Sequence, residues 1–179
     1  MTVLTRNPTN PNPLQPNKFS LSFSRTPNVQ FFCQTVSVPG IALSEVPQNT
    51  PFVDLYLPGE KAIYDILNVT FIIDEDLEAW REIHDWIRAM TFPFEYSEYE
   101  QLASLGRTAA GRTAPKPQYS DATLNILSSN NVGNYQFNFK DCFPTSLSNF
   151  VMSSTDSPDT VITADVTFRY SYYDIVKMS

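Results

Sequence analysis

A two-residue alternation near the carboxyl end limits this chain to a β-rich fold more than any other feature. Residues 161–176, VITADVTFRYSYYDIV, place an apolar or aromatic side chain at every second position, mostly with polar residues between them. The alternating set is Ile162, Ala164, Val166, Phe168, Tyr170 and Tyr172. Because successive side chains of a strand point to opposite faces, this pattern predicts one long strand with a buried face.

Weaker strand patterns lie along the rest of the chain. KFSLSFS and VQFFCQTVSV, separated by the turn RTPN, predict a hairpin, and DATLNILS and YQFNFKDC predict a second one around SNNVGN. YDILNVTFII predicts a further strand. Three prolines interrupt residues 41–61, so TPFVDLYLPGEK is expected to form at most a short or edge strand followed by a Pro-Gly turn. The sum is seven or eight strands.

The hydrophobic period changes after Ile73, where a helix is expected over about 75–90. Asp74 supplies an N-cap, and Pro93 prevents the helix from continuing. One apolar helix face is expected from Leu77, Trp80, Ile83, Ile87 and Met90. The fold class is therefore mainly β, an antiparallel two-sheet sandwich or barrel with one flanking helix and long arms.

The length of 179 residues suits one well-buried domain. Residues 1–17, rich in Pro, Asn and Thr, are expected to form an extended N-terminal arm, and residues 18–179 a single β domain. Within that domain, residues 94–119 form a long loop with a Tyr/Glu-rich start and a basic end. Loops of this length are usually functional or disordered, so we expect an arm that orders on a partner.

The composition argues against several classes of function. Twelve basic against 19 acidic residues give a formal charge of -7, which offers no electrostatic footprint for tight nucleic-acid binding. Cys33 and Cys142 are too few for a disulfide scaffold and are expected to be reduced core thiols. No apolar run approaches the ~20 residues of a membrane span, and the amino terminus lacks the apolar centre of a secretion signal, so folding in a cytosol is expected. Neither a cofactor nor a metal site is predicted.

Carboxylates and the single histidine are concentrated in the predicted helix, which raises the question of acid/base chemistry. Glu78, Glu82 and Asp85 lie opposite the apolar face, and His84 lies at its border beside Trp80. Nothing forces the pKa values of exposed carboxylates apart, so a solvated helix face is the favoured interpretation. A hydrolase that uses these carboxylates with His84 stays as the enzyme alternative.

Tyrosine-rich segments suggest a surface that a partner covers. YSYYDIV and FEYSEYEQ are candidates, because tyrosine is favoured at protein interfaces. Two alternatives stay open: the tyrosines line the rim of a sandwich, or they capture a ligand in a monomeric binding protein.

Four regions scattered along the chain contain motifs that follow one another in a recognisable order. NKFSLSF to PGI contains an aromatic-Cys strand that ends in Pro, and LNVTFIIDEDLEAWREIHDW is a strand that leads through acidic residues into a Trp-containing helix. FKDCFPTSLSNF holds a Phe-Pro-Thr-x-Leu segment, and ADVTFRYSYY is a terminal strand. With these motifs, over nearly half of its length, the chain resembles the tail tube proteins of contractile-tailed, myovirus-type bacteriophages.

The resemblance implies a structural, non-enzymatic subunit of a viral tail. Such subunits join edge to edge into hexameric rings, which stack around a channel through which DNA passes without specific binding. The implied partners are further copies of the chain and the tail sheath, baseplate or neck proteins, without a membrane. The implied location is the virion tail, after synthesis in the host cytoplasm. The longer N-terminal arm and the insertion at 94–119 depart from the family pattern, and leave open a specialised ring of the same fold, a baseplate initiator or a neck terminator.

The resemblance also indicates where the subunits touch. Contacts are expected on the N-terminal arm, on residues 41–61 and on the loop near residues 96–99. The residues expected to make inter-subunit contacts or to line the channel are Asp54, Glu60, Lys61, Tyr96 and Tyr99.

Overall fold

The computed structural model describes residues 12–91, 97, 118–155, 157 and 159–178. Predictions that concern residues 1–11, 92–96 or 98–117 lie outside this range. The described elements are β1 (Phe19–Phe23), α1 (Pro27–Phe31), β2 (Cys33–Ser37), β3 (Ile41–Asn49), β4 (Asp54–Tyr64), β5 (Leu67–Ile72), α2 (Glu78–Thr91), β6 (Ser120–Leu127), β7 (Gly133–Leu147), β8 (Thr163–Arg169) and β9 (Tyr172–Lys177).

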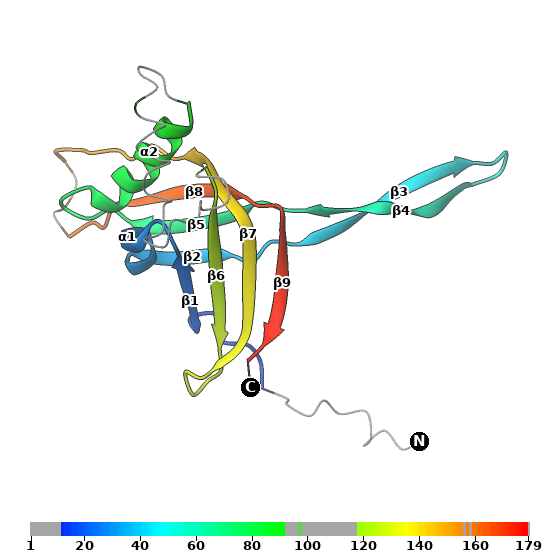
Figure 1. The fold of residues 1–179 in the computed structure, drawn as a ribbon, viewed down its shortest axis with the longest axis horizontal. Coiled ribbons are helices and arrows are strands. Elements are labelled where there is room, and N and C mark those ends of the chain that lie inside the picture. Colours follow the sequence, from blue (N-terminus) through cyan, green and yellow to red (C-terminus); the bar gives the residue numbers. More distant parts are fainter. Residues whose placement is uncertain (1–11, 92–96, 98–117, 156, 158, 179) are drawn as a thin grey trace.

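The fold is an antiparallel sandwich whose two sheets share one long strand, β7 (Figure 1). The first part of β7 pairs with β6 and β9, and β6 pairs with β1. The last part of β7 pairs with β8, which leads to β5 and β2. We call β1-β6-β7-β9 sheet I and β7-β8-β5-β2 sheet II. The mainly β, two-sheet fold class predicted from the sequence is confirmed.

The strand predicted over 161–176 is two strands. β8 belongs to sheet II and β9 to sheet I, and the chain changes sheets at Tyr170 and Ser171. β7 changes sheets at the same level, where Asp141 has a φ of 55° and the Ser171 N–H donates to the Lys140 carbonyl at 2.9 Å. The alternation in the sequence runs through this corner, but the core side changes from even to odd positions. Tyr172 was expected on the buried face and is exposed, whereas Tyr173, opposite Phe139, packs against the core. Periodicity alone does not reveal this change.

The core lies between the two sheets and carries the alternation that the sequence predicts. Ala164, Val166 and Phe168 of β8 are buried, and the Phe168 ring lies 4.8 Å from that of Phe23 in sheet I. The side chains that are fully buried come from both sheets and from both helices: Leu67, Val69, Phe71, Leu124, Phe139, Cys142, Val166, Phe168, Val29 and Ile83. Burying a side chain of this size contributes roughly 1.5–3 kcal/mol, so the sandwich has a core of its own.

Helix α2 begins three residues later than expected. Leu77 therefore takes the N-cap position predicted for Asp74, but the Asp74 carboxylate still caps the helix, because it accepts the N–H groups of Glu78 at 2.9 Å and Ala79 at 3.0 Å. Leu77, which lies between Asp74 and the helix, has a φ of 57° and an exposed side chain. The prediction that Leu77 lies on the apolar face of the helix was therefore wrong. The residues that α2 buries are Ala79, Ile83 and Trp86.

The hairpin expected over residues 19–38 is also wrong. β1 pairs with β6 and β2 with β5, and the short helix α1 separates them. Pro27 occupies the first turn of α1, where its missing N–H is not needed, and Val29 is fully buried. The apolar run VQFF therefore begins as helix rather than strand.

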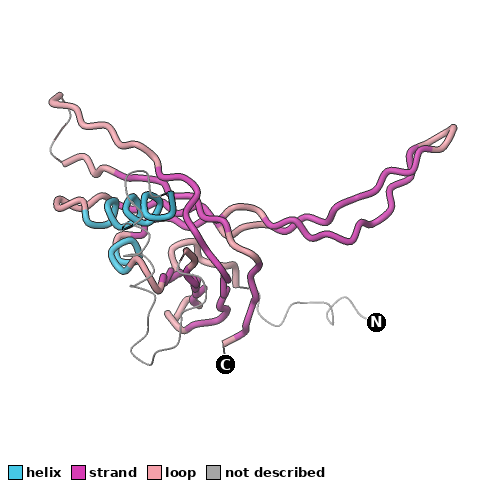
Figure 2. The backbone as a smooth tube through the Cα atoms, turned by 45° about the horizontal axis from the view of Figure 1, so that its top comes forward, coloured by secondary structure: helices cyan, strands magenta, loops and turns pink. Residues whose placement is uncertain are grey.

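The largest departure from the expected fold is a long two-stranded hairpin. Among the described residues, β3 and β4 pair only with each other, and the ribbon they form projects from the sandwich on the side away from the helices (Figures 1 and 2). The prolines predicted to limit this region are tolerated, because each strand has one free edge where no N–H donor is needed. Pro58 and Gly59 lie inside β4, next to a register shift, instead of forming a turn.

Candidate assembly interface

The ribbon exposes an apolar face. Val46 is paired with Leu57, and Leu55 follows on the same face because residues two apart in a strand point the same way. All three side chains are about half exposed, and Phe52 at the tip is 98% exposed. A lone hairpin is at best marginally stable in water. The ribbon therefore has the surface of an element that a partner covers.

In the part of the chain that the structure describes, sheet I ends in two free strand edges, β1 and β9. The Met178 N–H donates to Asn134 of β7, and Leu127 of β6 donates to the Lys18 carbonyl. Since backbone groups alternate in direction along a strand, the N–H and C=O groups of Tyr173 and Ile175 on β9 point away from β7. On β1, the same alternation turns those of Phe19, Leu21 and Phe23 away from β6. Each edge can therefore accept another strand.

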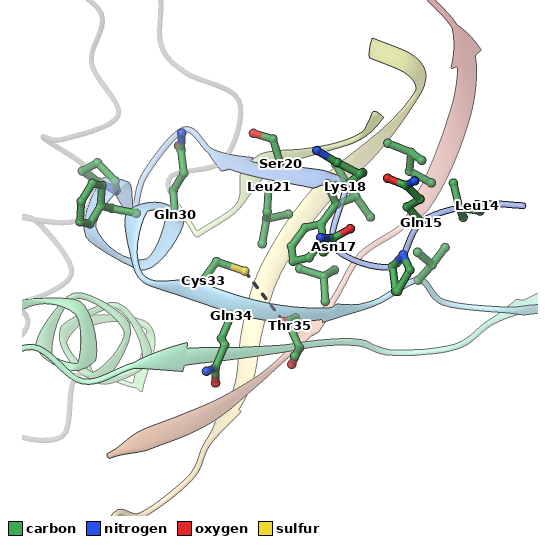
Figure 3. A pocket seen from close by; sticks show the side chains of 18 residues that line it. Leu14, Gln15, Asn17, Lys18, Ser20, Leu21, Gln30, Cys33, Gln34 and Thr35 are labelled. Atoms are coloured by element: carbon green, nitrogen blue, oxygen red, sulfur yellow. Dashed lines mark hydrogen bonds between the residues drawn. The ribbon is translucent and has the colours of Figure 1, made fainter. Parts of the chain in front are cut away.

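A groove runs between β1 and β2, beside the free edge of β1. It has a volume of about 1110 Å³, and Phe19, Leu21 and Val36 are among the apolar residues that line it. Figure 3 shows Leu21 of β1 and Cys33 of β2 pointing into the space between the two strands, while Ser20 points away from it. Sheets I and II thus stay apart on this side of the sandwich, and apolar side chains lie in the opening.

The outer face of sheet I carries rows of small, mostly uncharged polar residues. Paired positions give the rows Ser20, Asn125, Gln136, Val176 and Ser22, Thr123, Asn138, Asp174. Asp174 is the single charged residue of these two rows. Next to them, Lys140 Nζ lies 2.7 Å from Asp121 Oδ2, and this ion pair cancels both charges. Apart from Asp174 and Val176, these two rows offer hydroxyl and amide groups.

The structure places the sequence-predicted contact residues apart from one another. Asp54 lies at the tip of the ribbon, opposite Asn49, whereas Glu60 and Lys61 lie near its middle. All three side chains are exposed, and the backbone N–H of Lys61 donates to Ser44 Oγ at 3.3 Å. Tyr96 and Tyr99 lie outside the described residues. The segments expected to contact a partner include the ribbon and YSYYDIV, which contains most of β9, whereas no sequence motif pointed to the edge of β1.

The helix carboxylates make structural contacts. Asn28 Nδ2 of α1 donates to Glu82 Oε1 at 3.0 Å and to Glu78 Oε2 at 3.4 Å. Burial raises the pKa of Glu82, while hydrogen bonds from Asn28 and Val29 oppose the rise. Glu82 is thus half-buried between the helices rather than solvated as expected, and it ties α1 to α2.

The remaining members of the acid/base alternative contact their own helix. Asp85 accepts from Arg81 Nε at 3.3 Å, and its other oxygen lies 3.2 Å from His84 Nδ1. The His84 ring stacks on Trp80 with 5.1 Å between ring centroids, which confirms the packing predicted for it. These contacts give the helix a structural role and provide no separate acid and base.

The two cysteines are unpaired, as predicted. Burial raises the pKa of Cys33 to about 11 and that of Cys142 to about 12, so both thiols stay protonated and unreactive near neutral pH. Among the described residues, no group of three His, Cys, Asp or Glu side chains could hold a metal ion. The helices described here are too short or too polar to cross a membrane.

Comparison with known proteins gives this geometry a context. The tail tube terminator protein of Enterobacteria phage T4 is 28% identical over 148 residues, which cover 80% of this chain and 76% of the relative. Similar solved folds include a chain of the anti-feeding prophage baseplate, 6-fold symmetrised, with a TM-score of 0.62 at 12% identity over 93% of this chain and 97% of the other. The tube terminating cap of the same particle gives a TM-score of 0.56 at 13% identity over 99% and 100% of the two chains.

The family model described as phage tail tube protein matches residues 13–176, nearly the whole chain. The match contains every described strand and helix up to β9, as well as the ribbon and both free edges of sheet I. It confirms the resemblance stated from the sequence motifs. This chain therefore belongs to the phage tail tube protein family.

Proposed function

We propose that the protein is a structural subunit of a contractile tail, in which six copies form a ring that closes one end of the tube. The observation that carries the proposal is the pair of free edges on sheet I. β1 runs parallel to β7 and β9 runs antiparallel to it, so β9 of one subunit and β1 of the next run in opposite directions when both subunits have the same orientation. Head-to-tail contacts of this kind close into rings.

The groove between β1 and β2 supports the same junction. Ile175 is on the core side of β9, opposite Phe137, yet 55% of its surface is exposed. In a ring, β9 of the neighbour adds to the edge of β1, and its Ile175 enters the groove beside Phe19 and Leu21. The exposed Ile175 of one subunit and the partly buried Phe19 of the next are thereby buried together.

The channel of such a ring is lined by the polar face of sheet I. Sheet II and the helices lie on the core side of sheet I, so the bulkier layer takes the outer circumference and the polar face turns inward. Hydroxyl and amide rows, with Lys140 neutralised by Asp121, hold no array of free cations for phosphate groups. DNA would pass such a face without being retained.

In this arrangement the ribbon contacts the adjacent ring, and Asp54, Glu60 and Lys61 make polar contacts there. A terminal ring is preferred to the body of the tube because the curated relative is named a tail tube terminator and a tube terminating cap has the same fold. A repeating tube subunit is the second candidate, supported by the family description. These relatives are named as structural tail components, which also supports a non-enzymatic role in the virion tail, next to sheath, baseplate or neck proteins.

Negative-stain microscopy and mass photometry over a concentration series test the proposal. The expected result is rings of one diameter that stay single, whereas tubes that lengthen with concentration would indicate the second candidate. A strictly monomeric protein at all concentrations, also in the presence of purified tail tubes, would contradict both and favour the monomeric binding protein.

The edge contact itself is tested by Ile175→Pro with Ile175→Ala as its matched control. Both changes remove the apolar side chain, but only proline also removes the N–H that points away from β7. Ring formation is expected to be weakened by alanine and abolished by proline, with the same urea midpoint for both monomers. Rings formed equally by both variants would mean that β9 does not pair across the junction.

A further inference from the structure

Three tyrosines meet where the ribbon leaves the sandwich. Tyr64, the last residue of β4, lies 6.1 Å from the ring of Tyr170 and 5.4 Å from that of Tyr173, and the rings meet edge to face. Tyr170 and Tyr173 are themselves 6.1 Å apart. Such aromatic pairs contribute about 0.5–1.5 kcal/mol each beyond simple burial. The ribbon thus has aromatic contacts to the body at its base.

The hydroxyl groups of the two body tyrosines reach both strands of the ribbon. Tyr170 donates to the carbonyl of Asp65, just after β4, at 2.7 Å. Tyr173 donates to the carbonyl of Pro39, just before β3, at 3.4 Å. The Asp65 N–H donates in turn to the Gly40 carbonyl at 3.1 Å, which joins the two strand ends to each other. Each strand is therefore held at its own base.

The body side of this contact is rigid. The Phe139 ring is fully buried in the core, and it lies 5.1 Å from Tyr170 and 5.6 Å from Tyr173. Tyr170 is at the corner between β8 and β9, and Tyr173 is in β9, the free edge of sheet I. The same side chains that reach the ribbon thus belong to the edge that the proposed function places at the junction between subunits.

We propose that Tyr170 and Tyr173 are positioning residues that fix the direction of the ribbon and tie it to β9, so that closing the ring also sets the ribbon for contact with the adjacent ring. The first part needs the subunit alone. The second part rests on the proposed function. The two parts are linked because the Tyr173 side chain contacts the base of the ribbon, while its backbone belongs to β9, the strand that the neighbouring subunit joins.

The protonation of Tyr170 is consistent with this role. Burial, and after it the negative groups nearby, raise the pKa of Tyr170 above its ordinary value. The hydroxyl therefore keeps its proton over the physiological range and stays a donor to the Asp65 carbonyl.

Spin-label distances in the dilute monomer test the first part. Labels are placed on the ribbon at Gln48→Cys and on the body at Ser146→Cys, both exposed, in a Cys33→Ser background, while the fully buried Cys142 is kept. The parent is expected to give one narrow distance distribution, which is lost in the double variant Tyr170→Phe, Tyr173→Phe. Tyr172→Phe, a hydroxyl removed from the neighbouring exposed residue, is the matched control and keeps the narrow distribution.

An unchanged distribution in the double variant would overturn the positioning role. If that variant is poorly folded by circular dichroism, Tyr64→Ala replaces it, because this change removes the ribbon's own ring and leaves β9 intact. A narrow distribution with Tyr64→Ala would overturn the role equally.

The second part is tested in rings that contain labelled subunits diluted with unlabelled ones. Assembly is expected to narrow the spin-label distance distribution of the parent further. The distance distribution of the double variant is expected to narrow less. Equal widths in monomers and rings would overturn the coupling. If the parent forms no rings, the coupling fails together with the proposed function, whereas the monomer measurement still decides the positioning role.

Discussion

The sandwich and the ribbon are both built from antiparallel strands rich in apolar residues, yet they use those residues in opposite ways. In the sandwich, Phe71, Phe139 and Phe168 are fully buried, whereas Phe52 at the ribbon tip is almost fully exposed. The sandwich strands belong to two sheets that pack against each other, whereas within the described residues the ribbon strands pair only with each other. Strand pairing alone therefore does not decide whether a strand is self-sufficient.

This difference shows which side chains stabilise the isolated subunit. A buried aromatic side chain stabilises the monomer, because unfolding returns it to water. An exposed one contributes almost nothing until a partner covers it. Mutations should therefore separate the two regions, with large effects on folding in the sandwich and small ones in the ribbon.

The largest effect is expected from Phe168→Ala in the sandwich. This change empties space beside Phe23, at 4.8 Å, and Trp86, at 6.2 Å, and should lower the free energy of unfolding by about 3–5 kcal/mol. The measurement is urea denaturation followed by tryptophan fluorescence.

The matched change in the ribbon is Phe52→Ala, which should alter the free energy of unfolding by less than about 0.5 kcal/mol. If Phe168→Ala does not fold, Phe168→Leu gives the same comparison with a smaller loss. Similar losses at positions 168 and 52 would break the distinction between the regions.

A smaller effect within the sandwich is expected from Asp74→Ala. The variant loses both hydrogen bonds that the Asp74 carboxylate accepts at the start of α2, at a cost of about 1 kcal/mol. Asp74→Asn is the intermediate variant, because its one amide oxygen can keep one of the two hydrogen bonds but carries no charge. Equal unfolding midpoints for Asp74→Ala and the parent would show that the cap contributes nothing.

The charge of Asp74 also predicts a dependence on pH. Burial raises its pKa, but the amide hydrogen bonds of Ala79 and Glu78 together lower it more, so the folded-state pKa lies below the ordinary value. A lowered pKa means that the stabilisation is present above about pH 4 and is lost as the pH falls through the folded-state value. The advantage of the parent over Asp74→Asn should therefore shrink on acidification, as urea midpoints at several pH values would show.

The sequence predicted what local patterns determine. The alternation of β8, the cap at Asp74 and the β6–β7 hairpin all follow from residues close together in the chain, and the structure confirms them. The motif order also led to the right family.

Long-range pairing was beyond these patterns. β1 and β2 look like hairpin partners, but β1 pairs with β6 and β2 with β5, and in this arrangement Leu21 of β1 and Val29 of α1 are buried in one core. The ribbon was missed for the opposite reason. Its prolines count against a strand inside a sheet, and no local signal says that both of its strands are edges. The junction that we propose at β9 depends on the sheet order, which a single sequence does not contain.

The smallest effect on folding, and the sharpest contrast, is expected from Gly59→Ala in the ribbon. A Cβ atom at position 59 would lie 2.5 Å from the Ser44 carbonyl oxygen, a backbone atom of the opposite strand, so β3 and β4 would have to separate locally. Gly133→Ala is the control in the sandwich, where the new Cβ meets the flexible Met178 side chain at 2.7 Å.

Hydrogen exchange and urea denaturation together read out this contrast. Gly59→Ala should speed amide exchange in residues 41–64 and change the free energy of unfolding by less than about 0.5 kcal/mol, because the ribbon opens as a unit of low local stability. Gly133→Ala should leave exchange in the ribbon unchanged. A global loss from Gly59→Ala as large as that from Asp74→Ala would mean that the ribbon unfolds together with the sandwich. The aromatic contacts of Tyr64 would then stabilise the whole subunit, in addition to setting the direction of the ribbon.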